Sequence, residues 1–391
     1  MVQEYDLVII GGGPGGLSCA NEASKLGLSV LVLEDHKQIG VPVHCGECFS
    51  ELSSRRDKFR IPSSVISKKV RGVRITFPNG KRVVLEEPGF VLKKDKFEQW
   101  MAKSAKENGA MIRLASRACD IEKVDGGYEI TSLGSKFFAK IVIDASGANS
   151  FSSGKLGINK SSKTVLGVQY LVENVEWDNY LDFYILPKYA PFGYCWVIPK
   201  EDGKANIGLV SKVIGAKATQ NLDRFLDYLT IPKKKVVKTF GGLIPTTGPV
   251  AKIVDDSLMF IGDAAGFTSP MFEGGTQLAI TSGRFAAQIA RKAIEKDDVS
   301  TKMLSSYRKM CKKEFPNYDK LVKGKNAFYK LKAKEMDDLA ELLPEQFTSK
   351  MANSSTVILN LVGKKRHMIK KDVFLALMTL KYSKAKIMVG N

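Results

Sequence analysis

The hydrophobic pattern at the start of the chain predicts a strand, a helix and a second strand. Residues 5–10 are a short apolar run, residues 17–26 combine apolar and small side chains at helical spacing, and residues 29–33 are apolar again. Glycines fill the turn at residues 11–16, and Glu34 follows the second strand. This order is typical of the βαβ unit from which parallel sheets are built.

Beyond this unit the pattern favours antiparallel strands. Alternating positions predict one hairpin over residues 70–87, with its turn at 78–80, and another over residues 127–142. An amphipathic helix is expected at 95–107. Residues 155–245 are rich in β-branched and aromatic side chains, which favours a separate sheet. A buried strand at 257–261, a long helix at 275–296 and a mostly helical end from residue 301 complete the expected order.

We therefore expect a mixed α/β fold, in which a Rossmann-like domain is interrupted by an inserted antiparallel β-sheet domain and followed by a helical C-terminal region. The expected nucleotide-binding domain consists of residues 1–69, 88–154 and 246–300. Residues 70–87 and 155–245 are the expected β-rich substrate and catalytic domain, and residues 301–391 are the helical, basic region.

The glycine-rich turn is the first candidate site. Gly11, Gly13 and Gly16 form a G-x-G-x-x-G pattern directly after a predicted strand. The glycines permit a tight turn and a close approach to a pyrophosphate, which the N-terminus of the next helix attracts. Glu34, 18 residues past Gly16, is placed to bind a ribose hydroxyl. We predict a dinucleotide-binding site here.

A second nucleotide motif surrounds Asp263. This acid follows a buried strand and stands within the small residues of the sequence GDAAG, residues 262–266. An acid among small side chains can approach a sugar-like chain closely. Free N–H groups at the start of the next helix, near residues 274–276, suit a phosphate or a ring carbonyl. The alternative is an aspartate that only caps its own helix.

Charge is the unusual feature of the composition. The 391 residues include 60 Lys and Arg against 41 Asp and Glu, which gives a net charge of +19. From residue 301 onward there are 20 basic and 8 acidic residues, so the excess is concentrated at the end. A basic end favours an anionic partner, which can be a membrane surface, a nucleic acid or an acidic protein. A solvated, lysine-rich face is the alternative.

Other features narrow the class of protein. With 44% hydrophobic residues the chain can bury a core, which excludes wholesale disorder. No uninterrupted stretch of about 18 apolar residues is present, and the first residues lack the basic region of a signal peptide. Six scattered cysteines and three histidines argue against a disulfide framework and a metal site. No nucleic-acid-binding motif is present. We expect a cytoplasmic protein, peripheral on a membrane through the lysines at 364–381.

Three segments carry a resemblance to a known family. They are GVPVHCGEC at residues 40–48, PFGYCWVIP at residues 191–199, and residues 262–276 with Pro270 and the glycine pair 274–275. The first two are similar to the patterns G-x-P-x-x-C-G-E/G-G and P-x-x-Y-x-W-x-F-P of the geranylgeranyl reductases. The chain resembles this family, especially its archaeal digeranylgeranylglycerophospholipid reductases, within the p-hydroxybenzoate-hydroxylase-like FAD flavoproteins.

The resemblance implies an FAD-dependent reductase that saturates C=C bonds of geranylgeranyl or other polyprenyl chains, in archaeal-type ether lipids or their precursors. It implies hydride delivery from reduced flavin, with NADPH or a ferredoxin-like protein as the external electron donor. It places Glu34 on the adenosine ribose and Asp263 on the ribityl chain. The residues expected to contact FAD are Gly11, Gly13, Gly15, Gly16, Glu34, Cys45, Gly46, Cys48, Lys94, Ala118, Asp263, Gly275 and Thr276. Those expected to contact the lipid are Pro191, Tyr194, Trp196 and Pro199.

Four positions depart from the family pattern. Cys48 stands in place of glycine, Ile198 in place of phenylalanine, Lys94 in place of arginine and Thr276 in place of isoleucine. Lys94 keeps the charge but loses the bidentate geometry of arginine. We expect these departures to bear on the substrate more than on the flavin.

Tyr194, Trp196 and Cys45 are the candidate catalytic residues. Tyr194 and Trp196 are two positions apart, so on a strand their rings share a face and can wall an apolar tunnel. Ordinary core packing is the alternative. Tyr194 is a candidate proton donor, although the ordinary pKa of about 10 makes tyrosine a weak acid. Cys45 is expected near the flavin; a disulfide with Cys48 or Cys311, or an inert thiol, are the alternatives.

Two other functions stay open from the sequence. Residues 194–199, YCWVIP, also resemble the halogenase pattern W-x-W-x-I-P, so a flavin-dependent monooxygenase or halogenase is the main alternative. Tyr194 in place of the first tryptophan, together with the segment 45–47, favours the reductase. The second alternative is a flavin-loaded, basic binding protein that does not react with a prenyl lipid.

Overall fold

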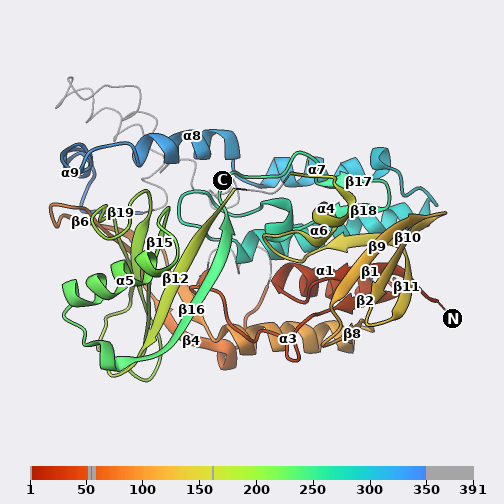
Figure 1. Cartoon of the computed structure of the whole chain (residues 1–391), viewed down its shortest axis with the longest axis horizontal. Helices are drawn as coiled ribbons and strands as arrows, with labels where there is room; N and C mark the ends of the chain where they lie inside the picture. Colours follow the sequence, from red (N-terminus) through yellow and green to blue (C-terminus); the bar gives the residue numbers. More distant parts are fainter. Residues whose placement is uncertain (1, 52–53, 55–58, 161–162, 349–391) are drawn as a thin grey trace. The chain divides into compact units, whose positions relative to one another are not determined.

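The computed structural model describes residues 2–51, 54, 59–160 and 163–348 (Figure 1). The chain divides into two compact units, each assembled from three stretches of sequence. Of the described residues, those within 2–43, 94–164 and 245–318 form unit 1, and those within 44–93, 165–244 and 319–348 form unit 2. The lysines at 364–381, which the sequence assigns to a membrane surface, lie outside the described residues.

A sheet with a parallel centre is the frame of unit 1. Its strands lie in the order β17-β18-β11-β1-β2-β8, and β10 and β9 continue it antiparallel from β11. β1 pairs in parallel with both β11 and β2, so the carboxyl ends of these strands meet at one edge. The strands are β1 (Gln3–Ile10), β2 (Val30–Leu33), β8 (Met111–Arg113), β9 (Ala118–Val124), β10 (Gly127–Ser132), β11 (Ser135–Asp144), β17 (Val254–Asp255) and β18 (Leu258–Phe260).

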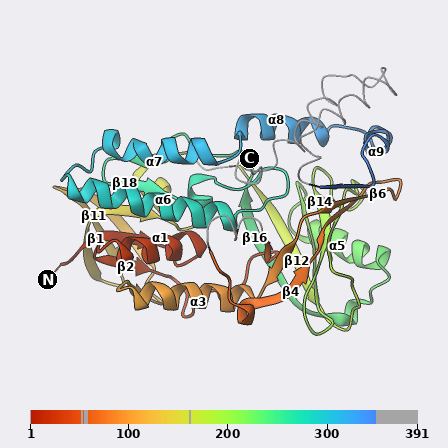
Figure 2. The ribbon, with the colours of Figure 1, turned by 180° about the vertical axis from the view of Figure 1, so that it is seen from behind.

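The helices of unit 1 pack closely because small residues lie between them. Helices α1 and α6 run side by side (Figure 2). A Cβ atom on Gly283 of α6 would lie 2.3 Å from the carbonyl oxygen of Gly15 in α1, so only glycine fits at this crossing. The helices are α1 (Pro14–Lys25), α3 (Lys94–Glu107), α4 (Phe151–Leu156), α6 (Thr276–Glu295), α7 (Thr301–Glu314) and the short 3₁₀ turn η3 (Gly262–Ala265).

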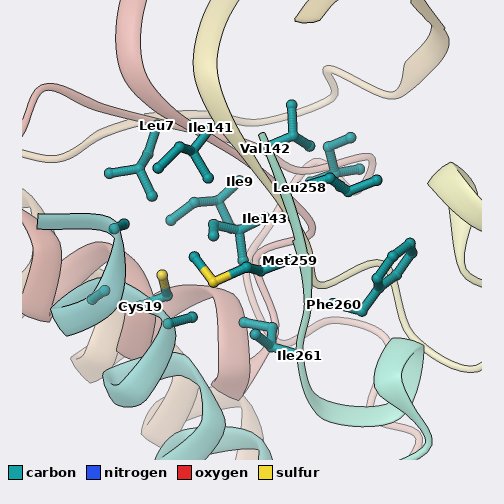
Figure 3. Packing of buried hydrophobic residues seen from close by; sticks show 14 of the residues in the cluster. Leu7, Ile9, Cys19, Ile141, Val142, Ile143, Leu258, Met259, Phe260 and Ile261 are labelled. Carbon is teal, nitrogen blue, oxygen red and sulfur yellow. The ribbon is translucent and has the colours of Figure 1, made fainter. Parts of the chain in front are cut away.

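The core of unit 1 fills the space between the sheet and these helices. Figure 3 shows side chains of β1, β11 and β18, among them Ile9, Ile143 and Met259, packed in one cluster that includes Cys19 of α1. All four are fully buried. The continuous apolar runs in the sequence therefore correspond to strands that are covered by neighbouring structure.

Unit 2 contains a second large sheet and a small one. The large sheet has the order β16-β12-β15-β14-β13-β5-β6-β19 and the small one β3-β7-β4. The strands are β3 (Cys48–Ser50), β4 (Ile66–Val70), β5 (Gly72–Thr76), β6 (Arg82–Glu86), β7 (Gly89–Leu92), β12 (Thr164–Val172), β13 (Tyr180–Tyr184), β14 (Tyr194–Pro199), β15 (Ala205–Ser211), β16 (Val236–Pro245) and β19 (Gln346–Thr348). The helical elements are α5 (Ala216–Tyr228), α8 (Tyr318–Phe328), α9 (Ala333–Glu341) and the 3₁₀ turns η1 (Ser63–Val65) and η2 (Lys233–Lys235).

The structure confirms the expected fold class, and it confirms most of the expected elements within the described residues. The first βαβ unit, both hairpins and the helices at 95–107 and 275–296 are present within a few residues of their predicted bounds. The large sheet of unit 2 is mostly antiparallel, but β5 pairs in parallel with β13, and β19 with β6. The expected antiparallel sheet is thus present, and the early hairpin β5–β6 joins it next to a strand from much later in the sequence.

Helix α5 was not expected, because its residues were included in a β-rich region. It nevertheless buries Leu222, Phe225 and Leu226, whose spacing is helical. Among the described residues, no helix is both long and apolar enough to cross a membrane.

Candidate functional site

The glycine turn of unit 1 brings backbone close to backbone. Gly11 has φ +106°, and a Cβ atom there would lie 2.4 Å from the carbonyl oxygen of Ala145. A Cβ atom on Gly16 would lie 2.0 Å from the carbonyl oxygen of Gly11. Gly13, the residue before α1, faces open space instead, since no atom lies within 4 Å of the position that its Cβ would take. The turn therefore has no room for side chains at Gly11 and Gly16, but it has open space beside Gly13.

The start of α1 presents backbone donors. Pro14 is the first helical residue, and no side-chain hydrogen bond caps the helix at Gly13. The first N–H groups of a helix have no partner within the helix, and the helix dipole adds partial positive charge there. An uncapped helix start behind an open glycine suits an anionic group such as a pyrophosphate.

Glu34 closes the other side of this turn. It follows β2 and is 8% exposed. Its Oε2 accepts a hydrogen bond of 2.7 Å from the N–H of Gly12, and its Oε1 accepts one of 3.0 Å from the N–H of His36. The His36 ring nitrogen Nδ1 lies 2.6 Å from the same oxygen. Two nitrogens of His36 already face Oε1, whereas Oε2 has one donor and keeps lone-pair capacity for another, such as a ribose hydroxyl.

Asp263 lies in η3, 13 positions before the first residue of α6, and its side chain reaches the start of that helix. Its Oδ1 accepts a hydrogen bond of 2.8 Å from the hydroxyl of Thr268 and lies 3.1 Å from the position of a Cβ on Gly275. Burial raises the pKa of Asp263, while the Thr268 hydrogen bond and the charge of Lys94 act in the opposite direction. Thr276 is the first residue of α6, and no side-chain hydrogen bond caps this helix at Gly275. The alternative expectation, an aspartate that caps its helix, is therefore not observed at α6.

Helix α6 connects the two nucleotide motifs. The Ser18 hydroxyl of α1 donates to the carbonyl of Ile280 at 2.9 Å, and the N–H of Gly262 donates to the Ser282 hydroxyl at 3.1 Å. Both Ile280 and Ser282 belong to α6. Residues 11–16 and residues 262–266 are therefore held against one rigid element, although about 250 positions separate them in the sequence.

Lys94 and Ala118 have different surroundings. Lys94 begins α3, is buried, and forms an ion pair with Glu98 one turn along the helix. Ala118 is buried at the start of β9. Two positions before it, the N–H of Ser116 donates to the carbonyl of Glu34 at 2.7 Å. The pairing of Lys94 with Glu98 was not foreseen, although the i, i+4 spacing of the two charges is visible in the sequence.

The residues of unit 1 fit a dinucleotide. The glycine turn supplies room, the uncapped starts of α1 and α6 supply N–H groups, and Glu34 and Asp263 supply acceptors for hydroxyls. The buried hydroxyl of Tyr318 has no hydrogen-bond partner among the described residues, and Asp263 is one of the charges that raise its pKa, after burial itself. An unpaired buried hydroxyl is a group that a ligand atom can satisfy.

Cys45, Gly46 and Cys48 lie in unit 2, where a polar network holds their segment. The carbonyl of Cys45 accepts a hydrogen bond of 2.8 Å from Gln169 of β12. Glu47 is buried, has φ +71°, and accepts a hydrogen bond of 2.6 Å from Asn206 of β15. Lys200 pairs with the same carboxylate oxygen. The segment is thus fixed to the face of the large sheet.

Tyr194 and Trp196 lie side by side on β14, as their spacing predicts. Their ring centroids are 5.9 Å apart, and the Tyr194 ring meets Phe183 edge to face at 5.4 Å. The indole N–H of Trp196 donates to Gln169 at 3.2 Å. A Cβ on Gly208 would lie 2.4 Å from Cζ2 of Trp196, so the glycine leaves room for the indole ring. Pro199, the last residue of β14, is buried, and Pro191 is half-buried in the preceding loop.

The thiols are all free. None of the six cysteines takes part in a disulfide, so the pairing of Cys45 with Cys48 or with Cys311 is not observed. Burial raises the pKa of Cys48, and the charges of Cys45 and Glu47 act in the same direction. Cys48 therefore stays a neutral thiol at physiological pH. The Nδ1 of His44 lies 2.7 Å from the carbonyl oxygen of Gly241, so this side chain is held by a hydrogen bond to the backbone.

Little in the sequence indicated the polar residues of unit 2 that hold the Cys45 segment. Gln169, Glu47, Asn206 and Lys200 connect the Cys45 segment to the sheet. One signal was present, because Gln169 is a single polar residue within the apolar run of β12. The predicted FAD residues are divided between the units: Cys45, Gly46 and Cys48 belong to unit 2, and the others to unit 1.

Comparison with known proteins shows to which family the chain belongs. A digeranylgeranylglycerophospholipid reductase of Thermoplasma volcanium is 32% identical over 395 residues, which cover 95% of this chain and 99% of the relative. The chain belongs to this reductase family. The relative of the same name from Methanosarcina acetivorans is 33% identical, with coverage of 87% and 89%. The chain also matches, over residues 6–325, the family described as lycopene cyclase protein.

Solved structures agree with this membership of the reductase family. A geranylgeranyl bacteriochlorophyll reductase-like protein from Thermoplasma acidophilum has a TM-score of 0.86 and 31% identity, covering 96% of this chain and 100% of that one. A flavin-dependent brominase has a TM-score of 0.71 at 18% identity, with coverage of 97% and 99%. At that identity the brominase shows a common fold alone.

Proposed function

We propose that the protein is an FAD-dependent reductase that saturates C=C bonds in geranylgeranyl chains of archaeal-type ether lipids or their precursors. One observation carries the proposal: relatives named digeranylgeranylglycerophospholipid reductase match the chain over nearly its whole length, at about one third identity. The dinucleotide-type site of unit 1 supports a cofactor that carries redox chemistry.

FAD is the proposed dinucleotide. A halogenase with this fold has been solved in complex with FAD, at 16% identity and a TM-score of 0.70. The turn at residues 11–16 and the start of α1 would hold the pyrophosphate, Glu34 the adenosine ribose, and Asp263 with the start of α6 the ribityl chain. When bound and reduced, the flavin supplies a hydride. Cys45, Gly46, Cys48, Lys94 and Ala118 are proposed as further residues of the cofactor site.

Unit 2 is proposed to position the lipid. An isolated alkene has no carbonyl that the protein can polarise, so alignment and exclusion of water must lower the barrier. The rings of Tyr194 and Trp196 form a buried aromatic surface that suits a prenyl chain. Pro191, in the loop before β14, and Pro199, the last residue of β14, are proposed to contact the lipid as well. Tyr194 is the proposed proton donor, and Cys45 is proposed to act beside it.

The proposed function also requires an electron donor and access to a membrane lipid. The external electron donor is proposed to be NADPH or a ferredoxin-like protein. A phospholipid substrate resides in a membrane, so the protein is proposed to work in the cytoplasm at an anionic membrane surface, held by its excess of positive charge.

Oxygen reactivity separates this function from a monooxygenase or halogenase. The reduced holoenzyme is mixed with air-saturated buffer, alone, with a geranylgeranyl lipid, and with aromatic substrates. We expect no aromatic compound to accelerate oxygen consumption or to appear as an oxygenated or halogenated product. Stimulation of oxygen uptake by an aromatic substrate, with the lipid left unsaturated, would overturn the reductase assignment.

A further inference from the structure

Two adjacent loops of unit 2 form one surface. The loop at residues 187–193 precedes β14, and residues 212–217, which are a loop that runs into the first two residues of α5, follow β15. Because β14 and β15 are antiparallel and Tyr194 lies opposite Val210, both loops emerge at the same end of the sheet. The carbonyl of Pro191 accepts hydrogen bonds from the Ser211 hydroxyl at 2.9 Å and from the Lys212 N–H at 3.3 Å. We call residues 187–193 and 212–217 the loop pair.

The loop pair exposes two large apolar side chains. Phe192 is 46% exposed and Ile214 is 70% exposed. Phe192 has φ +57°, a left-handed conformation that aromatic residues seldom adopt. The next residue, Gly193, runs so close to β15 that no side chain fits there, because a Cβ would lie 1.8 Å from the carbonyl oxygen of Val210. A strained backbone that keeps an aromatic ring at the surface indicates a function for that ring.

The charges of the loop pair are all positive. Lys188, Lys212 and Lys217 are exposed, and neither loop contains an acidic residue. The Lys212 ammonium lies 4.2 Å from the centre of the Phe192 ring. The Lys188 ammonium lies 5.5 Å from the centre of the Tyr189 ring. Cations beside exposed aromatic and aliphatic tips are the composition that binds the headgroup region of anionic membranes.

We propose that the loop pair is the surface by which the protein docks on an anionic lipid bilayer. Phe192 and Ile214 enter the boundary between headgroups and acyl chains, and the three lysines lie against lipid phosphates. This proposal rests on the lipid substrate proposed above and assigns the membrane contact to described residues. Charge complementarity favours a bilayer over a nucleic acid, because Ile214 contributes nothing to binding a polyanion in water.

Vesicle flotation tests the surface directly. The full-length protein is mixed with phosphatidylcholine vesicles, with or without phosphatidylglycerol, at low and at high salt. The wild type is expected to bind the anionic vesicles at low salt. Combining Phe192→Asn with Ile214→Ser is expected to weaken binding at least tenfold. Asparagine tolerates the left-handed backbone of position 192, so this variant is expected to fold. Replacing the three lysines by glutamine should cost about fivefold in partitioning for each charge at low salt.

A matched control removes an exposed apolar residue elsewhere. Leu133, in the turn between β10 and β11 of unit 1, is 73% exposed and lies three positions before Lys136. Leu133→Ser should float like the wild type. Equal flotation of the wild type and the Phe192→Asn/Ile214→Ser variant would overturn the proposal and assign any membrane contact to another surface. So would binding that depends on the lysines alone, which is the behaviour of a site for a polyanion.

Flotation requires no turnover, so the two proposals fail separately. A wild type that floats through the loop pair but never reduces a geranylgeranyl lipid would contradict the proposed function and leave the docking surface in place. A wild type that reduces the lipid and floats independently of the loop pair would do the opposite.

Discussion

At the scale of one residue, the burial of the Asp263 carboxylate is expected to lower the free energy of unfolding at neutral pH. Its carboxylate is buried beside the start of α6, and that burial raises its pKa. The folded protein therefore holds the proton more tightly than the unfolded chain does. The free energy of unfolding falls as the pH rises from about 3.8, the ordinary value, through the raised pKa of the folded state.

Asp263→Asn should make the flavin-free protein more stable at neutral pH while weakening FAD binding. Asparagine still accepts the hydrogen bond from Thr268 but carries no buried charge. The unfolding midpoint of the variant should exceed that of the wild type at pH 7, and the difference should shrink below pH 3.8. FAD affinity, measured by fluorescence titration, should fall about tenfold with the loss of a charge-assisted hydrogen bond. A variant less stable than the wild type at pH 7 would contradict the raised pKa.

Gln169 is the residue through which Trp196 and the Cys45 segment hold their positions. Gln169→Met keeps the size of the side chain but leaves the indole N–H and the Cys45 carbonyl without this partner. We expect a loss of about 1–3 kcal/mol in the free energy of unfolding, together with a changed tryptophan emission spectrum and lower turnover. The matched control is Gln288→Met in unit 1, which removes an amide hydrogen bond to Glu22. Turnover and emission that are unchanged in Gln169→Met would remove this positioning role.

The residues of the site differ in how visible they were in the sequence. Gly11, Gly16 and Glu34 belong to a local pattern whose spacing follows from a tight turn and a single helix. The partners of Glu47 could not be predicted, because Asn206 reaches it only through the register of β15 within a sheet. Local chemistry was predictable, and pairing across a sheet was not.

At the scale of elements, the crossing of α1 and α6 should be intolerant of side chains. Gly283→Ala places a methyl group 2.3 Å from the Gly15 carbonyl oxygen and must separate the helices. We expect a loss of about 1–3 kcal/mol in stability and weaker FAD binding, because both nucleotide motifs lie against α6. Chemical denaturation and flavin titration measure the two effects.

Gly154 of α4 is the matched control for that substitution. It is also a helical glycine, but no atom lies within 4 Å of the position of its Cβ. Gly154→Ala should be neutral or should stabilise the protein by up to about 1 kcal/mol. If Gly154→Ala and Gly283→Ala have equal effects, helix propensity rather than close packing would account for the result.

Helices and strands were predictable where the hydrophobic residues of a segment followed a single helical or strand-like spacing. Residues 257–261 and 275–296 have clear strand and helix patterns, and β18 and α6 follow them. Helix α5 was overlooked because its 13 residues lie between strands in a region of β-type composition. The parallel pairing of β5 with β13 joins segments about 100 residues apart, and no local pattern encodes such a contact.

At the scale of the whole molecule, each unit is built from three separated stretches of chain. The nucleotide motifs belong to unit 1, whereas Tyr194, Trp196 and the Cys45 segment belong to unit 2. The proposed reaction needs both sets of residues, one for the cofactor and one for the lipid. This division explains why the sequence pattern switches from parallel to antiparallel strands and back.

In the proposed reaction, reducing equivalents pass from the protein's flavin to a prenyl double bond. The most direct measurement is anaerobic: the holoenzyme is reduced with dithionite, a geranylgeranyl lipid is added, and flavin absorbance and lipid mass are followed together. We predict reoxidation of the flavin with a gain of two hydrogens in the lipid for each flavin reoxidised. A flavin that stays reduced in the presence of the lipid, with no change in lipid mass, would contradict the account.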